Sequence, residues 1–472
     1  MKQSLDTNLK KMTYQIKSEV TGPGKPVLPA KTAMLILCGA VMVATATRLV
    51  SADKPSNDYV AHEWGTFTSV QGSDGVLLEW QPLETSRLPK FVYNWTHPGA
   101  GRPLDLTKAT TLSLQRMETP VIYFYSASEQ TVDVAVRFPQ GVITEWYPQA
   151  SEISRGMLPI PPASARADKD LQKTGSVIDS VGPISLRKES YAKWGHMGIL
   201  PEKKNSEMGQ SLPQDPSGSH YFAARMTDSD YLSSSVAANC STEHEKFIFY
   251  RGVGNFETPL RVMMTSENTA ILVNTGHEAI GHLFVLQLRD QSGNFQYVDR
   301  LAPGEQQTIA LSAGSQVIPL EKLSHQLGER IGEALVKEGL YPREASAMVN
   351  TWTDSWFQEE GVRVLYVLPR GWTDLTLPLT LTPAPRQLTR VMVGRSEVIP
   401  ADVQRTLAEA LTKSAAGDPE ARERAIAQMA KLGRFAEPAV RLVTKDSTLQ
   451  EKQSAWKLLY ERPTAKVALS SP

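Results

Sequence analysis

The amino-acid sequence predicts a mainly β protein with two β-sandwich-like units, an inserted helical hairpin and a C-terminal α-helical unit. Three observations predict this fold class. Short runs of β-branched and aromatic residues alternate with turn residues over most of the chain. Apolar residues then recur every four positions within residues 319–360. The same helical spacing returns from residue 400 onward.

The composition of the 472 residues is that of a globular protein, because 41% are apolar and 21% are charged. A disordered chain would be less apolar, and a multi-span membrane protein would be less charged. Basic and acidic residues number 50 each, so the formal net charge is zero. This balance argues against a dedicated nucleic-acid binder, and no nucleic-acid partner is expected.

The first 52 residues predict export. Residues 1–31 form a basic leader, and residues 32–47 are uncharged and mostly apolar. A helix of that length spans about 24 Å, short of the ~30 Å hydrocarbon core. Small residues follow at the spacing of a cleavage site before Asp53, which is typical of a secretory signal. Residues 32–52 are therefore predicted to be a signal peptide or a single membrane anchor, with a buried core helix as a further alternative.

Export predicts a protein that is periplasmic, on the cell surface, secreted, or anchored to the membrane by one N-terminal helix. Membrane contact is expected only through residues 32–47, if they stay uncleaved. Both Met1 and Met12 fit as the start of the leader. The chain has two cysteines, and Cys38 lies in the export segment, so Cys240 alone remains and no intrachain disulfide is expected.

Residues 53–156 are predicted to form the first β-sandwich-like unit. The runs VIYFYS (121–126) and VDVAVRF (132–138) have the composition of strands, and the second alternates with period two. Residues 157–244 differ, because seven prolines fall within 157–219 among Lys, Ser and Gly. This segment is predicted to be an irregular insert, or a linker with a few short strands.

Residues 245–318 are predicted to form the second β-sandwich-like unit. Apolar runs follow one another at spacings near ten residues, separated by turns, and this rhythm is typical of an antiparallel sandwich. Met117-Glu-Thr-Pro and Phe256-Glu-Thr-Pro open similar stretches in the two units. Either the two units are related by an internal repeat or the likeness arises by chance.

The period then changes to that of a helix. Four apolar residues recur at four-residue spacing: Leu323, Leu327, Ile331 and Leu335. Gly339 suits the end of this helix and Pro342 the start of the next, so residues 319–360 are predicted to be a helical hairpin. Residues 361–399 contain three strand-like runs that are expected to complete the β body.

Residues 400–472 are predicted to be helical again. Asp418 suits an N-cap, Pro419 the first turn and Gly433 a helix end. The stretch ARERAIAQMAKLGRFAEPAVRLV (421–443) resembles a HEAT-type repeat. Because a free solenoid needs about three repeats, this HEAT-like unit is expected to dock on the β body or to form a small helical cap.

Carboxylates beside tryptophans suggest a sugar-handling cleft, in which rings stack on sugars and paired acids transfer protons. Three Glu-Trp dipeptides occur, and acidic residues flank Trp356. The candidate catalytic residues are Glu63, Glu145, Asp354 and Glu359, and the candidate ligand-binding residues are Trp64, Trp80, Trp146 and Trp356. The alternative is that each tryptophan fills a core or a sheet edge.

The metal-binding signals are incomplete. His277-Glu-Ala-Ile-Gly-His282 has one residue too many for the H-E-x-x-H of zincins, which places both histidines on one helical face. Different strands could still gather His62, His196 or His220 as metal ligands, and the alternative for each is a polar contact or surface exposure. No P-loop, G-x-S-x-G or C-x-x-C motif is present, so no cofactor is expected.

Several long stretches resemble an uncharacterised family of exported bacterial proteins. They are HEWGTFTSVQGSDG (62–75), RMETPVIYFYS (116–126), FPQGVITEWYPQA (138–150), EKFIFYRGVGNFE (245–257) and MVNTWTDSWFQEEGVRVLYVLPR (348–370). The resemblance covers about residues 60–370 and implies one integrated body. It implies no activity, cofactor or catalytic residue.

The sequence therefore favours an exported or membrane-tethered cell-envelope protein that binds a protein or glycan partner without catalysis. The absence of standard catalytic motifs and the sandwich and HEAT-like elements motivate this hypothesis. The alternative is a glycan- or metal-dependent hydrolase whose site gathers His, Glu and Trp residues of the β body. Convergence of two carboxylates or three His/Glu ligands in one pocket would favour the hydrolase.

Overall fold

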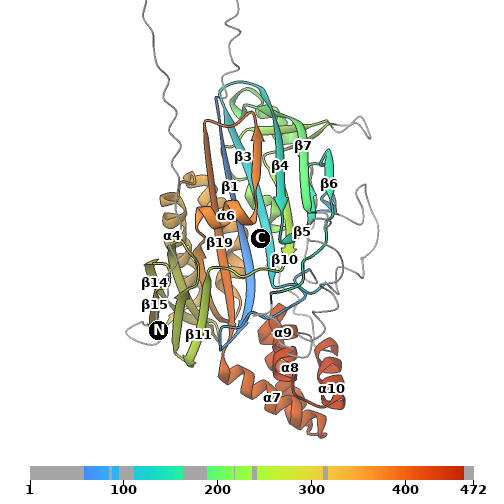
Figure 1. Ribbon diagram of the computed structural model, residues 1–472, viewed down its shortest axis with the longest axis vertical. Helices are drawn as coiled ribbons and strands as arrows, with labels where there is room; N and C mark the ends of the chain where they lie inside the picture. Colours follow the sequence, from blue (N-terminus) through green and yellow to red (C-terminus); the bar gives the residue numbers. More distant parts are fainter. Residues whose placement is uncertain are drawn as a thin grey trace, which may run out of the picture. The chain divides into compact units, whose positions relative to one another are not determined.

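The computed structural model (Figure 1) describes residues 58–83, 88–94, 111–162, 189–216, 218–235, 242–311 and 317–461, which belong to one compact unit, Asn57–Pro472. The predicted leader, residues 32–52 and Cys240 lie outside these residues. Within these ranges, no helix is both long and apolar enough to span a bilayer. The described part is mainly β with a C-terminal helical region, as the sequence predicted.

A ten-stranded mixed sheet runs through this unit. Its strands, in spatial order, are β16 (Ile318–Pro319), β14 (Ser292–Leu301), β13 (Ile280–Arg289), β17 (Gly361–Val367), β19 (Gln387–Ile399), β1 (Tyr59–Gly72), β3 (Gln115–Ser126), β10 (Ile248–Gly254), β5 (Gly141–Tyr147) and β2 (Tyr93–Asn94). Neighbouring strands are antiparallel except β1 and β19, which pair in parallel from Val60 opposite Gln387 to Gly72 opposite Ile399.

Two smaller antiparallel sheets accompany the ten-stranded sheet. The first contains β18 (Leu379–Thr382), β4 (Gln130–Phe138), β7 (Ser190–Leu200), β8 (Tyr231–Ser234) and β9 (Glu243–Glu245), with β6 (Glu152–Ser154) paired to β7. The second contains β11 (Leu260–Ser266), β12 (Thr269–Asn274) and β15 (Gln306–Ala310). In Figure 1, β4, β7 and β6 lie beside one another.

The two predicted sandwich units are not separate. Strands from residues 53–156 and from residues 245–318 both enter the ten-stranded sheet, where β3 pairs with β10. Two strands of residues 361–399, β17 and β19, lie in the same sheet between β13 and β1, whereas β18 joins the smaller sheet beside β4. Alternation indicates which side chains are buried but not which strands pair, so the regular turn spacing predicted local pairings and missed the long-range ones.

Each face of the ten-stranded sheet has its own hydrophobic core. One core joins it to both smaller sheets, with Tyr59 and Phe67 of β1 contributing. The other core, with Trp64 of β1, joins it to helices. Tyr59 and Phe67 therefore lie on the opposite face from Trp64. Each is an odd number of positions away from Trp64, and the two-residue period of a strand places such residues on opposite sides. The first face is called the sheet-side face below, and the second the helix-side face.

The helix-side face is covered by α4 (Leu320–Lys337), α5 (Pro342–Thr353) and the π-helix η6 (Asp354–Gln358). The four residues at four-residue spacing in α4 are all buried, and Gly339 after it adopts a φ of 105°. This left-handed conformation favours glycine and ends the helix. Pro342 then opens α5, where the missing N–H of proline has no cost.

The predicted irregular insert contains a strand that the sequence analysis missed. β7 pairs with β4 over most of its length, and Trp194 of β7 is buried in the core of the sheet-side face. Glycines at 195 and 198 weaken the strand signal, and the flanking prolines dominate the composition of the segment. Short 3-10 helices η3 (Glu202–Lys204), η4 (Ser206–Ser211) and η5 (His220–Arg225) follow β7.

The remaining helices follow β17 and β19 in the chain. Helix α6 (Arg370–Thr376) follows β17. The C-terminal region contains α7 (Ala401–Ala415), α8 (Pro419–Leu432), the 3-10 turn η7 (Gly433–Phe435), α9 (Ala436–Val443) and α10 (Leu449–Glu461). These helices lie together near the ends of β1 and β19, and they share a third core with Val70, Trp80 and Ile399 (Figure 1). The Asp418 carboxylate accepts a hydrogen bond from the Ala421 N–H, as an N-cap does.

Candidate functional site

The candidate carboxylate Glu63 is buried on the sheet-side face, where it neutralises an arginine. Arg390 Nε lies 2.5 Å from Glu63 Oε2, and the Tyr250 hydroxyl donates to Glu63 Oε1 at 2.5 Å. Arg390 also donates to Asp374 and to the Leu377 carbonyl, both at 2.7 Å. Every polar partner of Glu63 is thus a group of the fold itself, and its contact with Arg390 is a charge-assisted hydrogen bond inside the protein.

Glu145 and Glu359 lie on the opposite, helix-side face, and each is also bound to arginine. Arg251 Nε donates to Glu145 at 2.7 Å, and Arg395 donates to Glu359 at 2.6 Å. Burial opposes ionisation of Glu359, but the fields of Arg395 and Arg434 outweigh it and lower the pKa of that carboxyl. A glycosidase needs one acid with a raised pKa, so this environment is the reverse of a general acid.

Asp354 starts the π-helix η6 and is exposed. The structure therefore does not bring the four candidate carboxylates into one cleft. Glu63 lies on the sheet-side face, and the ten-stranded sheet separates it from Glu145 and Glu359. Asp354 lies in η6, one of the helices that cover the helix-side face. Glycoside hydrolysis requires two facing acids, and Glu63 cannot face Glu145 or Glu359 through the sheet.

The structure corrects the prediction that four tryptophans bind a ligand. Trp64, Trp80 and Trp356 are 0% exposed, and Trp146 is 2% exposed. Trp64 and Trp356 lie in the helix-side core, Trp146 in the sheet-side core and Trp80 in the core of the C-terminal helices. Their rings stabilise these cores and have no free face for a sugar, which is the alternative that the sequence left open.

The three candidate metal ligands lie apart. His62 Nδ1 is 2.8 Å from Glu344 of α5, and both side chains are fully buried. His196 is exposed beside Asp133, at 3.4 Å. His220 opens η5 and packs against the Trp352 ring at a centroid distance of 5.4 Å. Among the described residues, no group of three or more His, Cys, Asp or Glu side chains is placed to hold a metal ion.

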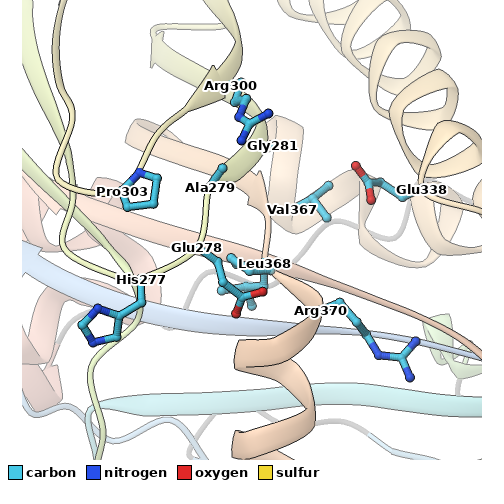
Figure 2. A pocket seen from close by; sticks show the side chains of 11 residues that line it. His277, Glu278, Ala279, Gly281, Arg300, Pro303, Glu338, Val367, Leu368 and Arg370 are labelled. Carbon is cyan, nitrogen blue, oxygen red and sulfur yellow. The ribbon is translucent and has the colours of Figure 1, made fainter.

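An open pocket of about 500 Å³ lies where β13, β14, α4 and α6 meet (Figure 2). It is lined by His277, Glu278, Ala279, Gly281, Arg300, Pro303, Glu338, Val367, Leu368, Pro369 and Arg370. Figure 2 shows Glu278 beside the start of α6, where its carboxylate accepts a hydrogen bond from the Gly371 N–H at 3.3 Å. The lining combines five polar side chains, those of His277, Glu278, Arg300, Glu338 and Arg370, with five apolar ones, so it offers several partners to a polar ligand.

A chain of polar contacts supports one wall of this pocket. His282 Nε2 lies 3.5 Å from Glu338, and its Nδ1 lies 2.7 Å from the Tyr297 hydroxyl, which donates to Asp299 at 2.8 Å. Desolvation, and then the Asp299 carboxylate, raise the pKa of Tyr297 to about 12, so the hydroxyl keeps its proton at neutral pH. His282 has a φ of 51° at an irregularity of β13. The wall is therefore fixed before any ligand arrives.

Two side chains of the pocket that can donate hydrogen bonds have no partner among the described residues. Arg300, near the end of β14, and His277, before β13, are exposed and form no hydrogen bond or ion pair there. Arg370, by contrast, donates to Asp374 at 2.7 Å and to the Leu388 carbonyl at 3.1 Å. Arg300 and His277 can therefore donate to a ligand without breaking a contact of the fold.

The sequence analysis found only part of this pocket. It noted His277, Glu278 and His282 as an incomplete zinc motif, and the structure places them in a turn and a strand instead of a helix. It missed Arg300, Glu338 and Arg370, because each is an ordinary charged residue at the end of a different element. Only the pairing of β13 with β14 and β17 brings these ends together.

Comparisons with known proteins add little to this geometry. No protein-family model and no curated protein matches the sequence. Among solved structures, the chain is similar to the yeast delta-COP-I mu-homology domain complexed with a Dsl1 WxWxV peptide. The sequence identity is 6%, the match covers 73% of this chain and 98% of that chain, and the TM-score is 0.25. A similarity at that level supports no conclusion about this chain.

Proposed function

We propose that the protein is an exported or membrane-tethered cell-envelope protein that binds a protein or glycan partner without transforming it. Its ligand site is the open pocket between β13, β14, α4 and α6. The observation that carries this proposal is the pair of unpartnered donors, Arg300 and His277, beside the carboxylates of Glu278 and Glu338. Donors and acceptors within one pocket match the hydroxyl, amide and charged groups of glycans and peptides.

The proposal includes the two finer expectations from the sequence. Residues 32–52 act as a signal peptide or single anchor, and the C-terminal helices form a HEAT-like unit that is docked on the β body. Support for docking comes from the core that these helices share with β1 and β19. The hydrolase alternative has less support, because three of the four carboxylates considered for it, Glu63, Glu145 and Glu359, are bound to arginines on two faces of one sheet.

The test is equilibrium binding of soluble envelope glycan fragments and peptides to the full-length chain, followed by calorimetry. We expect Arg300→Ala and His277→Ala to weaken binding of the selected ligand about tenfold to a hundredfold, since hydrogen bonds to charged groups contribute about 1.5–3 kcal/mol. The matched control is Arg405→Ala, which removes an exposed arginine of α7. Mass spectrometry should recover the ligand intact.

Two results would overturn the proposal. Affinity that is equal in the wild type and both pocket variants would remove the pocket from the function. A ligand that is recovered as cleavage products, at a rate that depends on Glu145, Asp354 or Glu359, would favour the hydrolase.

A further inference from the structure

A row of charged residues crosses the buried helix-side face of the ten-stranded sheet. Its members come from five strands, β17 and β19 on one side of β1 and β3, β10 and β5 on the other, and are Arg363, Arg395, Glu397, Arg116, Glu118, Arg251 and Glu145. Thr68 of β1 pairs with Arg395 on one side and with Arg116 on the other, so these two arginines point from the same face. Buried charges of this kind need hydrogen-bonding or ionic partners.

Most arginines of the row are fully bonded. Arg363 donates to Glu397 and to backbone carbonyls of the segment 355–360. Arg395 donates to Glu397 at 2.8 Å, to Glu359 at 2.6 Å and to the Ser355 carbonyl at 2.5 Å. These contacts hold η6 against the sheet and leave no spare donor for a ligand.

Arg116 and Arg434 differ, because both converge on a single carboxylate oxygen. Arg434, from the 3-10 turn η7, donates to Glu118 Oε1 at 2.9 Å, and Arg116 Nε lies 3.4 Å from the same atom. Arg116 is only 6% exposed, and none of its N–H groups forms a hydrogen bond with the described residues. Arg434 Nε and Nη2 are also buried without a hydrogen bond, although Nε is 3.5 Å from Glu359.

The surroundings leave an excess of positive charge at this point. Arg251 is close enough to act on Arg116, and it is bonded to Glu145. Burial, together with Arg251 and Arg434, lowers the pKa of Arg116 to about 10 despite the opposing field of Glu118. Among the described residues, five arginines meet four carboxylates here: Arg116, Arg251, Arg363, Arg395 and Arg434 against Glu118, Glu145, Glu359 and Glu397. A water molecule would satisfy the free N–H groups, but it would not balance the charge.

We infer that Arg116 and Arg434 form a binding site for a small oxoanion, phosphate or sulfate, between β3 and the C-terminal helices. Two guanidinium forks match the oxygens of a tetrahedral anion, and this match is why arginine is preferred at phosphate sites. The bound anion ties β3 to η7, since one arginine comes from each. The site is separate from the pocket of Figure 2, whose lining includes neither residue.

The test is titration of the full-length chain with sodium phosphate, and separately with sodium sulfate, at constant ionic strength set by chloride. Isothermal calorimetry and thermal unfolding provide the readouts. We expect saturable binding by the wild type, with a rise in Tm that follows the binding curve. Arg116→Gln should weaken binding at least tenfold. Arg300→Ala, which removes the unpartnered arginine of the pocket, should leave it unchanged.

A third variant covers the case in which Arg116→Gln does not fold. Arg116→Lys keeps the charge but loses the fork, so we expect anion affinity to fall several-fold. The inference is overturned if the wild type shows no saturable binding, or if either Arg116 variant binds the anion as tightly as the wild type. It is also overturned if Arg300→Ala abolishes binding, because the anion would then occupy the pocket.

Discussion

Replacement of Glu118 by glutamine tests the buried charge row most directly. The Glu118 carboxylate lies between Arg116 and Arg434, at 3.4 Å and 2.9 Å. Burial alone would raise its pKa, but the fields of the two arginines outweigh burial and lower the pKa to about 2. A pKa of about 2 in place of 4.5 corresponds to about 3 kcal/mol of stability from the ionised form. Breaking a buried pair typically costs a similar amount, about 3–5 kcal/mol.

Arg116 does not share this stabilisation, since its own pKa is lowered to about 10. The two responses differ because Arg116, Arg434 and Arg395 together outweigh the burial of Glu118, whereas burial and two repelling arginines outweigh the carboxylates that act on Arg116. The figure of about 3 kcal/mol is therefore assigned to Glu118 alone. For a folded unit of this length it corresponds to a fall in Tm of about 4 °C.

The assay is urea unfolding of the wild type and Glu118→Gln between pH 8 and pH 2. Because the folded-state pKa is depressed, the contribution of Glu118 is fully present above about pH 4.5 and is lost as pH falls toward 2. We expect the variant to be about 3 kcal/mol less stable at pH 7 and the two curves to converge in acid. Glu423→Gln, on the exposed face of α8, is the matched control.

Two results would refute the reasoning. One is equal stability of the wild type and Glu118→Gln at pH 7. The other is a constant difference between their curves down to pH 2, which would mean that the lost stability does not depend on ionisation.

Three further predictions concern the fold. Glu63→Gln should cost about 3–5 kcal/mol in urea unfolding, because it leaves Arg390 buried beside an uncharged group, and the double change Glu63→Leu with Arg390→Met should recover much of the loss. Gly394→Ala should lower stability by about 1–3 kcal/mol, because the new Cβ would overlap the Tyr366 ring, and a second change Tyr366→Leu should reduce the effect. Trp80→Ala should cost about 3–5 kcal/mol and speed tryptic cleavage within residues 401–461, whereas unchanged cleavage would show that Trp80 does not hold those helices.

The sequence predicted the helices of this fold better than its sheets. The four-residue spacing in α4 and the Gly339–Pro342 boundary depend on neighbouring residues, so local sequence contains the whole signal. Strand pairing depends on contacts such as that of β1 with β19, where Thr66 donates a hydrogen bond to the Val393 carbonyl, 327 residues away. No periodicity within either strand identifies its partner.

The candidate site was harder to predict for a related reason. The sequence pointed to Glu-Trp dipeptides, but adjacent residues of a strand face opposite sides, so Trp64 and Trp146 entered cores while Glu63 and Glu145 paired with arginines. Arg116 and Arg434 gave no signal at all, because charged residues ordinarily predict an exposed surface. Their burial follows from the docking of η7 on the sheet, which is a property of the assembled fold.

The parallel pair of β1 and β19 also sets a time order for folding. β1 is the first of the described strands to be synthesised, yet one of its two neighbours, β19, is the last of them. At about 5–20 residues per second, the ribosome needs roughly 15–60 s to produce β19 after β1. During that interval one edge of β1 carries unpaired backbone groups, and these are the groups through which chains aggregate. Folding of this protein therefore depends on protection of the open edge of β1 until β19 has been synthesised.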